Sequence, residues 1–146
     1  MLIYDLTVFP VDHAMTVEEA IAQVDRLAGG WQIGLGRDHR LDAFIGHVQE
    51  RWPELRGERE NERPFEFDVM RHHVFVGIPP EAVERVLPAI AQAAWTSGVA
   101  VLDPQRQVVG LPAPFAEGPL GTDGVAEVIA ATEAEEKADE AADTPS

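Results

Sequence analysis

The sequence contains no cysteine, which excludes disulfide bonds, thiol nucleophiles, iron–sulfur ligation and zinc sites built from cysteine. It has only two serines, Ser97 and Ser146, and neither lies in the strand-to-helix context of a nucleophile elbow. No stretch approaches about 18 consecutive apolar residues, and the chain begins directly as a strand at residues 2–6, without a signal-peptide pattern. We therefore expect a cytoplasmic protein that does not cross a membrane.

Positive charge is scarce, because 11 Lys and Arg residues stand against 26 Asp and Glu residues, which gives a formal net charge of −15. Residues 111–146 hold nine acids and one lysine, so the acidity is strongest near the C-terminus but extends over the whole chain. Such a field repels nucleic acid and anionic membranes and speeds the encounter with a basic protein. The composition predicts a basic protein partner, although solubility alone would also explain the charge.

Hydrophobic periodicity predicts one α+β domain over residues 1–110. Alternation predicts strands at 2–8, 65–70, 74–78 and 99–102, with a short return at 107–109, and helical spacing predicts helices at 17–28, 41–52 and 80–97. This β-α-α-β-β-α-β order is that of a ferredoxin-like sandwich with one additional helix. We expect an antiparallel sheet with all helices on one face.

Local signals support these elements. Thr16 and Glu19 have the spacing of a capping box at the start of the first helix. Gly98 would end the third helix in the left-handed conformation, and the interior Pro88 predicts a kink without dividing that helix.

The composition changes after residue 110. Residues 111–124 are rich in proline and glycine, which predicts a linker. Residues 125–146 form an acidic C-terminal tail that begins with helix-forming composition, whereas the run from Glu133 onward is polar enough to be disordered.

Patterns for bound phosphate and metal are incomplete. Gly34 and Gly36 have no third glycine at the required spacing and no Gly-Lys-Ser/Thr sequence. The five histidines form no His-x-x-x-His or His-Glu-x-x-His pattern, and adjacent His72 and His73 would point to opposite faces of a strand. We therefore predict no cofactor, no metal and no catalytic residues.

Three aspartates deserve comparison. Asp5, Asp68 and Asp103 could converge near one end or face of the sheet, where carboxylates support acid/base chemistry or hold a divalent cation. The favoured interpretation is structural: Asp5 accepts backbone hydrogen bonds, Asp68 is exposed, and Asp103 caps the Asp-Pro turn.

Three short motifs carry a resemblance. Tyr4-Asp5-Leu6, Trp52-Pro53-Glu54-Leu55 and Asp103-Pro104-Gln105 resemble the spaced signature of a large group of small bacterial proteins, most of them uncharacterised. The resemblance covers residues 1–112, with Gly98-Val99 standing where similar proteins have a Gly-Leu step. Some similar proteins lie beside toxin genes, so the resemblance implies an immunity protein and implies no catalytic residue.

Two function classes remain. The first is a non-enzymatic acidic binding protein of the inhibitor or immunity type, which presents its acidic and aromatic sheet face, or the helix end near Asp103, to a basic partner. The alternative is a small-ligand-binding enzyme or sensor with a polar pocket near Asp5, His73 and Asp103. The open sheet face or an edge strand also offers a surface for a homodimer. The predicted binding residues are Asp5, Asp68, His73, Phe75, Asp103 and Gln105.

Overall fold

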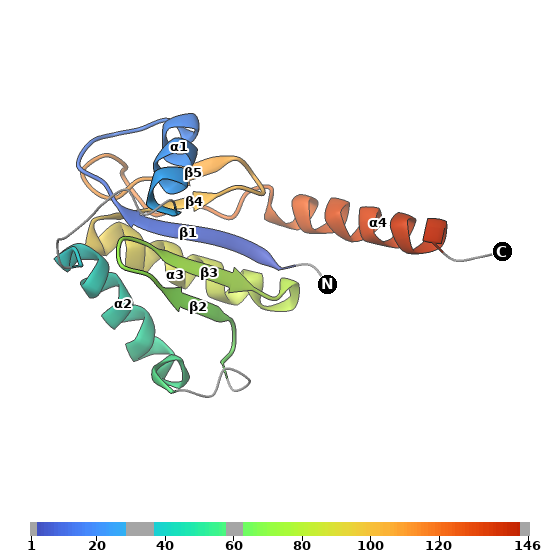
Figure 1. Cartoon of the computed structure of the whole chain (residues 1–146), viewed down its shortest axis with the longest axis horizontal. Coiled ribbons are helices and arrows are strands. Elements are labelled where there is room, and N and C mark those ends of the chain that lie inside the picture. The colour runs from blue at the N-terminus through green and yellow to red at the C-terminus, as the bar shows by residue number, and fades with distance from the viewer. Residues whose placement is uncertain (1–2, 29–36, 58–62, 144–146) are drawn as a thin grey trace.

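A computed structural model of the chain describes residues 3–28, 37–57 and 63–143, with side chains as far as residue 139. The expected glycine-containing loop at 31–36 lies outside these ranges. Within them the chain has a mixed α+β fold (Figure 1). The strands are β1 (Tyr4–Pro10), β2 (Glu66–Val69), β3 (Val74–Ile78), β4 (Val99–Asp103) and β5 (Val108–Gly110). The α-helices are α1 (Val17–Ala28), α2 (His39–Arg51), α3 (Val83–Ser97) and α4 (Val125–Asp143).

The described strands form one antiparallel sheet in the order β2-β3-β1-β4-β5. β1 is central, as expected for a strand that is apolar on both sides, and pairs with β3 and β4. The sheet has a fifth strand beyond the four main strands of the expected pattern, because residues 108–110 turn back against β4.

Helices cover both faces of the sheet, so the expected one-sided arrangement was wrong. Tyr4 and Leu6 of β1 contribute to the core shared with α2 and α3, whereas Phe9, Ala100 and Leu102 form a second cluster under α1 (Figure 1). The physical reason lies in β4, whose five residues are all buried. A strand buried on both sides needs cover on both faces.

The predicted capping box and the helix-ending glycine are confirmed, and the kink at Pro88 stays a prediction. The Thr16 hydroxyl accepts from the Glu19 N–H at 3.2 Å, and the Glu19 carboxylate accepts from the Thr16 N–H at 3.3 Å. Gly98 ends α3 with a φ of 88°. Pro88 lies within α3, which remains one helix, and its ring is exposed.

α4 projects from the body as a separate rod (Figure 1). Val125 is buried, and Val128 and Ile129 pack against the main core. The helix continues past Glu133 to Asp143, where we expected disorder. Its many Ala and Glu residues have high helix propensity, which favours continuation once the first turns are docked. None of the helices in the described ranges is long and apolar enough to cross a membrane.

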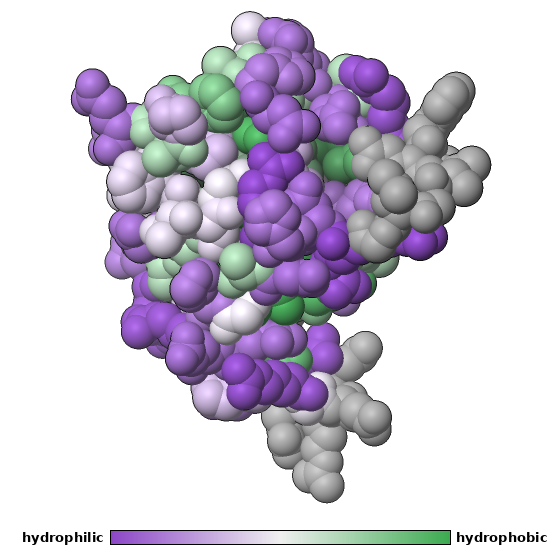
Figure 2. All heavy atoms as spheres, turned by 90° about the vertical axis from the view of Figure 1, so that its left-hand side faces the viewer, coloured by the Kyte–Doolittle hydropathy of each residue, from purple (hydrophilic) through white to green (hydrophobic). Residues whose placement is uncertain are grey.

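The end of the molecule opposite α4 has a mixed surface. Figure 2 shows that polar residues dominate this face and that hydrophobic residues appear there as separate areas, outside the parts drawn in grey.

Candidate functional site

A buried polar network joins β1 to the turn after β4. Asp103 is fully buried, and its Oδ2 accepts hydrogen bonds from the Tyr4 hydroxyl at 2.6 Å and from Arg106 Nε at 2.7 Å. Its Oδ1 accepts from Gln105 Nε2 at 2.8 Å and from the Arg106 backbone N–H at 3.1 Å. The turn after β4 places Gln105 and Arg106 within hydrogen-bond distance of the Asp103 carboxylate. Four donors therefore occupy the acceptor positions of Asp103.

Gln105 extends the network to the backbone of β1. Its Oε1 accepts from the Asp5 N–H at 2.7 Å, and its Nε2 donates to the Asp5 carbonyl at 2.7 Å. The side-chain amide thus replaces the backbone of a neighbouring strand where β4 has ended. Two of the three motifs, Tyr4-Asp5-Leu6 and Asp103-Pro104-Gln105, meet here and hold the sheet together.

Arg106 connects this network to the beginning of α4. Its side chain is 8% exposed beside the fully buried Asp103. One terminal nitrogen, Nη1, donates to the carbonyls of Gly121 at 2.7 Å and Asp123 at 3.0 Å. The segment before α4 is thereby fixed to the turn after β4.

The protonation of Tyr4 argues against its phenol as a catalytic base. Burial, supported by the hydrogen bond to Asp103, raises the pKa of Tyr4 far above its usual value, so the phenol stays protonated as a donor. Burial also raises the pKa of Asp5. A catalytic base works best with a pKa near the operating pH, and Tyr4 is shifted away from that range.

The sequence-predicted residues do not share one site. Asp5 lies opposite Gly77, while His73 lies beyond the other end of β3, a separation on the order of 13 Å along the strand. Asp68 and Phe75 are direct partners on β2 and β3, and Asp68 is exposed. Asp68 is exposed and Asp103 caps the turn after β4, as the structural interpretation predicted, whereas its statement that the Asp5 carboxylate accepts backbone hydrogen bonds stays a prediction.

The two surfaces predicted to bind a partner are the helix end near Asp103 and the open sheet face. Asp103 itself is buried and engaged by four donors, so its carboxylate has no free acceptor position for a partner. The sheet face is only half open, because α1 covers β4 and β5. Exposed Glu66 and Asp68 and half-buried Phe75 remain on the uncovered half.

His73 is half-buried, and its Nδ1 has no hydrogen-bond partner among the described atoms. Burial, together with the neighbouring His72, lowers its pKa. None of Asp5, His73 and Asp103 lines the hollows described below. The pocket predicted for a small ligand near those residues therefore stays a prediction.

The motif at the end of α2 is also structural. The rings of Trp52 and Phe65 meet edge to face with centroids 5.0 Å apart. The guanidinium of Arg51 lies over Trp52 at 5.4 Å, and Leu55 is buried in the main core. This contact seals the core where α2 approaches the β2–β3 hairpin.

Sequence reasoning missed a second ionic cluster, at the start of α2. Asp38 caps the helix, accepting from the Arg40 N–H at 2.8 Å and from Arg40 Nη2 at 2.9 Å. Arg40 also bonds the Val11 carbonyl at 2.7 Å and pairs with Asp12 at 3.0 Å. The Arg40 side-chain bonds lower the pKa of Asp38 to about 2. The Asp-x-Arg sequence before an apolar helix was the available signal.

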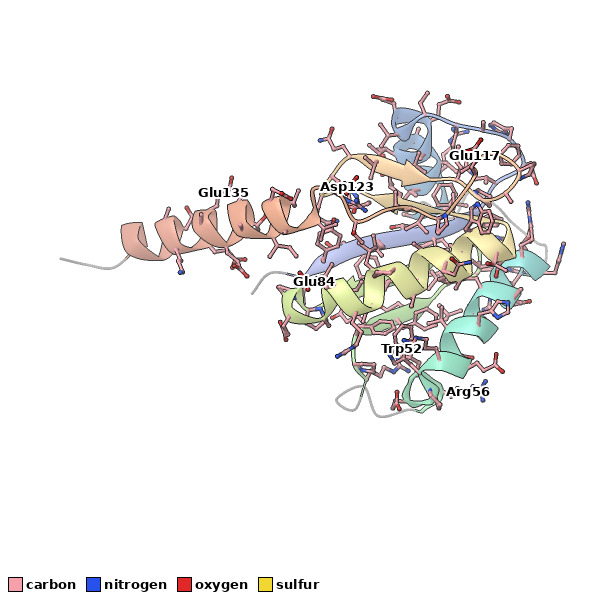
Figure 3. The ribbon with its side chains drawn as sticks, turned by 180° about the vertical axis from the view of Figure 1, so that it is seen from behind. Trp52, Arg56, Glu84, Glu117, Asp123 and Glu135 are labelled. Atoms are coloured by element: carbon pink, nitrogen blue, oxygen red, sulfur yellow. The ribbon has the colours of Figure 1, made fainter. Side chains whose placement is uncertain are left out.

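An acidic groove lies between the beginnings of α3 and α4, with a volume of about 740 Å³. In Figure 3 the labelled Glu84 and Asp123 lie on two sides of the base of α4, and Glu135 lies farther out on that helix. Val83, Val125 and Ile129 contribute apolar lining. Every ionisable residue among the described lining is an acid: Glu81, Glu84, Asp123, Glu127 and Glu133.

No three His, Asp or Glu side chains within the described ranges come together in a group that would hold a metal ion. Comparison of the chain with protein-family models, with curated proteins and with solved structures found no match. The resemblance to small bacterial proteins therefore stays a prediction. The function has to be argued from the residues themselves.

Proposed function

We propose that this chain is a non-enzymatic acidic binding protein, of the inhibitor or immunity type, that holds a basic segment of a protein partner in the groove between α3 and α4. One observation carries the proposal: the groove combines an apolar lining with acids as the ionisable residues of its described wall. A cationic amphipathic segment matches both properties.

The two kinds of lining have different roles in this proposal. Exposed ion pairs contribute only about 0 to 1 kcal/mol each, so carboxylates such as Glu84 and Glu127 mainly select the partner and speed association. Affinity would come from apolar area buried against the exposed Pro88 and the half-buried Ile129 of the lining. The fixed start of α4 supports this arrangement, because Arg106 holds one wall of the groove in place before the partner arrives.

The same proposal includes the type of fold and the location of the protein in the cell. We infer that β1 to β4 with α2 and α3 form a ferredoxin-like core to which α1, β5 and α4 are added. The central position of β1 between β3 and β4 supports this inference. A cytoplasmic location belongs to the proposal, and cell fractionation tests it.

The experiment measures binding of a fluorescent helical peptide with Arg on one face and Leu on the other, by anisotropy at moderate salt. We expect the Glu84→Gln/Glu127→Gln double variant to bind about tenfold more weakly than the unchanged protein. The matched control is Glu18→Gln/Asp25→Asn, which removes the same charge from exposed positions on α1. This control variant loses the same net charge as the groove variant, so any effect of the overall field is equal in the two proteins. Because its substitutions lie outside the groove, its peptide affinity should change less than about twofold.

Equal loss in the two double variants would mean that the peptide responds only to net charge. That result would overturn the assignment of the groove.

A further inference from the structure

β2 is an outer strand of the sheet, so its far edge offers backbone groups to another chain. The Met70 N–H bonds the His73 carbonyl at 2.9 Å, and bonding alternates along an antiparallel pair. Phe67 and Val69 therefore direct their N–H and carbonyl groups away from β3. Arg63 confirms this direction, because its Nη1 donates to the Phe67 carbonyl from outside the sheet at 3.3 Å.

Two hollows follow this edge, with volumes of about 390 and 350 Å³. Arg63, Phe67 and Asp68 line both of them. One continues toward Ile3, and the other continues toward Met70. Together they form a groove along β2 that the Arg63 side chain divides.

Arg63 is a weak occupant of this position. Its bond to Phe67 is longer than the 2.9 to 3.0 Å typical of an N–H···O bond. Its Nε is buried without a hydrogen-bond partner among the described atoms, while Nη2 reaches the Gly57 carbonyl at 3.1 Å. A backbone N–H from an added strand would replace the bond to Phe67 with better geometry.

The charges on β2 decide what can occupy this edge. Glu66 and Asp68 are both exposed on the same face of the strand. If a second copy paired antiparallel through this edge, Glu66 would face Asp68, or one of these acids would face its own counterpart. Like charges directly opposite each other destabilise a strand pair. The edge therefore disfavours self-association, which the sequence had left open.

We propose that the outer edge of β2 is a strand-addition site for an extended segment of another protein that carries Lys or Arg at alternate positions. These cations would lie beside Glu66 and Asp68, and the residues between them would lie over the hollow near Leu55 and Met70. The site is separate from the α3–α4 groove and does not depend on the function proposed there.

The first test uses ¹⁵N-labelled full-length protein and a short synthetic peptide that alternates Lys with Thr or Val. The expected result is shifted resonances and slower hydrogen exchange for the Phe67 and Val69 amides. A matched peptide that is N-methylated on alternate residues cannot complete the backbone ladder and should lose binding. Shifts confined to residues of the α3–α4 groove, or no shift at all, would overturn the strand-addition site.

Variants separate charge from backbone pairing. Glu66→Gln/Asp68→Asn should weaken peptide binding about tenfold, and Arg63→Ala should strengthen it a few-fold by vacating the edge. Circular dichroism would show whether each variant is folded. The groove variant Glu84→Gln/Glu127→Gln should bind this peptide as the unchanged protein does, so failure here is distinguishable from failure of the groove. Unchanged affinity in the Glu66→Gln/Asp68→Asn variant would overturn the proposed charge selection.

Self-pairing provides the last test. Glu66→Lys would place the new lysine opposite Asp68 of a second copy, so light scattering should show a dimer for this variant and a monomer for the unchanged protein. An unchanged protein that dimerises through the β2 edge would contradict the proposal.

Discussion

The carboxylate of Asp103 and the carboxylates of the α3–α4 groove belong to two different electrostatic environments. Asp103 is fully buried, and four donors from Tyr4, Gln105 and Arg106 surround it. Glu84 and Glu127 are exposed, and the ionisable lining around them is acidic. The oxygens of Asp103 already accept four hydrogen bonds, so the network has no free acceptor for a ligand. In the groove, a cation that enters would reduce the repulsion between the carboxylates.

This difference teaches where to look for function in the chain. The three motifs that carry the resemblance contain the most distinctive residues, yet the structure uses them to join strands and seal the core. The surfaces with unused charge, at the groove and on β2, consist of glutamates and aspartates that look ordinary in the sequence. A buried charge must keep its partner, because losing one member of the pair is costly, while exposed charges are available to another protein.

The largest effect should come from breaking the buried network. Asp103→Asn keeps the size of the side chain but leaves Arg106 without its carboxylate, and removing one member of a buried ion pair costs about 3 to 5 kcal/mol. Urea denaturation would measure this loss in the free energy of unfolding. Exposed Asp68→Asn is the matched control and should change stability by less than about 0.5 kcal/mol. Similar losses in the free energy of unfolding for the two variants would contradict the stabilising role given to the buried network.

A smaller effect is expected at the cluster that begins α2, and it depends on pH. Arg40 lowers the pKa of Asp38 from 3.8 to about 2, so the unfolded chain takes up this proton first as the pH falls. The contribution of Asp38 is complete above about pH 5 and is lost as the pH falls through 4 toward 2. With allowance for partial exposure we expect about 1 to 2 kcal/mol.

Asp38→Asn tests this prediction, because asparagine still caps a helix but carries no charge. The stability difference between the two proteins, measured by urea denaturation, should be largest near neutral pH and should shrink toward pH 2. A difference that is constant with pH would show that the cap alone, without its charge, accounts for the stability.

The smallest effect should come from neutralising the groove. Glu84→Gln and Glu127→Gln each remove a like-charge repulsion in the groove, but each also removes an acid from the first turn of a helix, where the macrodipole favours negative charge. The two effects oppose each other, so each variant should change the free energy of unfolding by less than about 0.5 kcal/mol, and the change should shrink further at high salt, which screens both. Thermal unfolding at two salt concentrations measures it, and a loss of more than about 1 kcal/mol would indicate that these carboxylates have stabilising partners.

Particular residues show how far the sequence could be read. The Thr16–Glu19 capping box and Gly98 depend on neighbours within a few positions, so their structures followed from local chemistry. The position of α1 did not, because α1 and α2 both have an apolar side and the pattern does not say which face of the sheet each will cover. The polar network was likewise hidden, since Tyr4 and Asp103 are separated by 99 positions.

The sequence by itself determined the strands and most of the helices, the absence of thiol chemistry and the strong negative charge, because each depends on composition or on short-range periodicity. Only the tertiary structure decided that Asp103 is enclosed, that Glu84 lies beside α4, and that β2 is an outer strand with Arg63 across its edge. These outcomes depend on which distant segments pack together, and packing is set by the burial of whole faces, which no local window of residues contains.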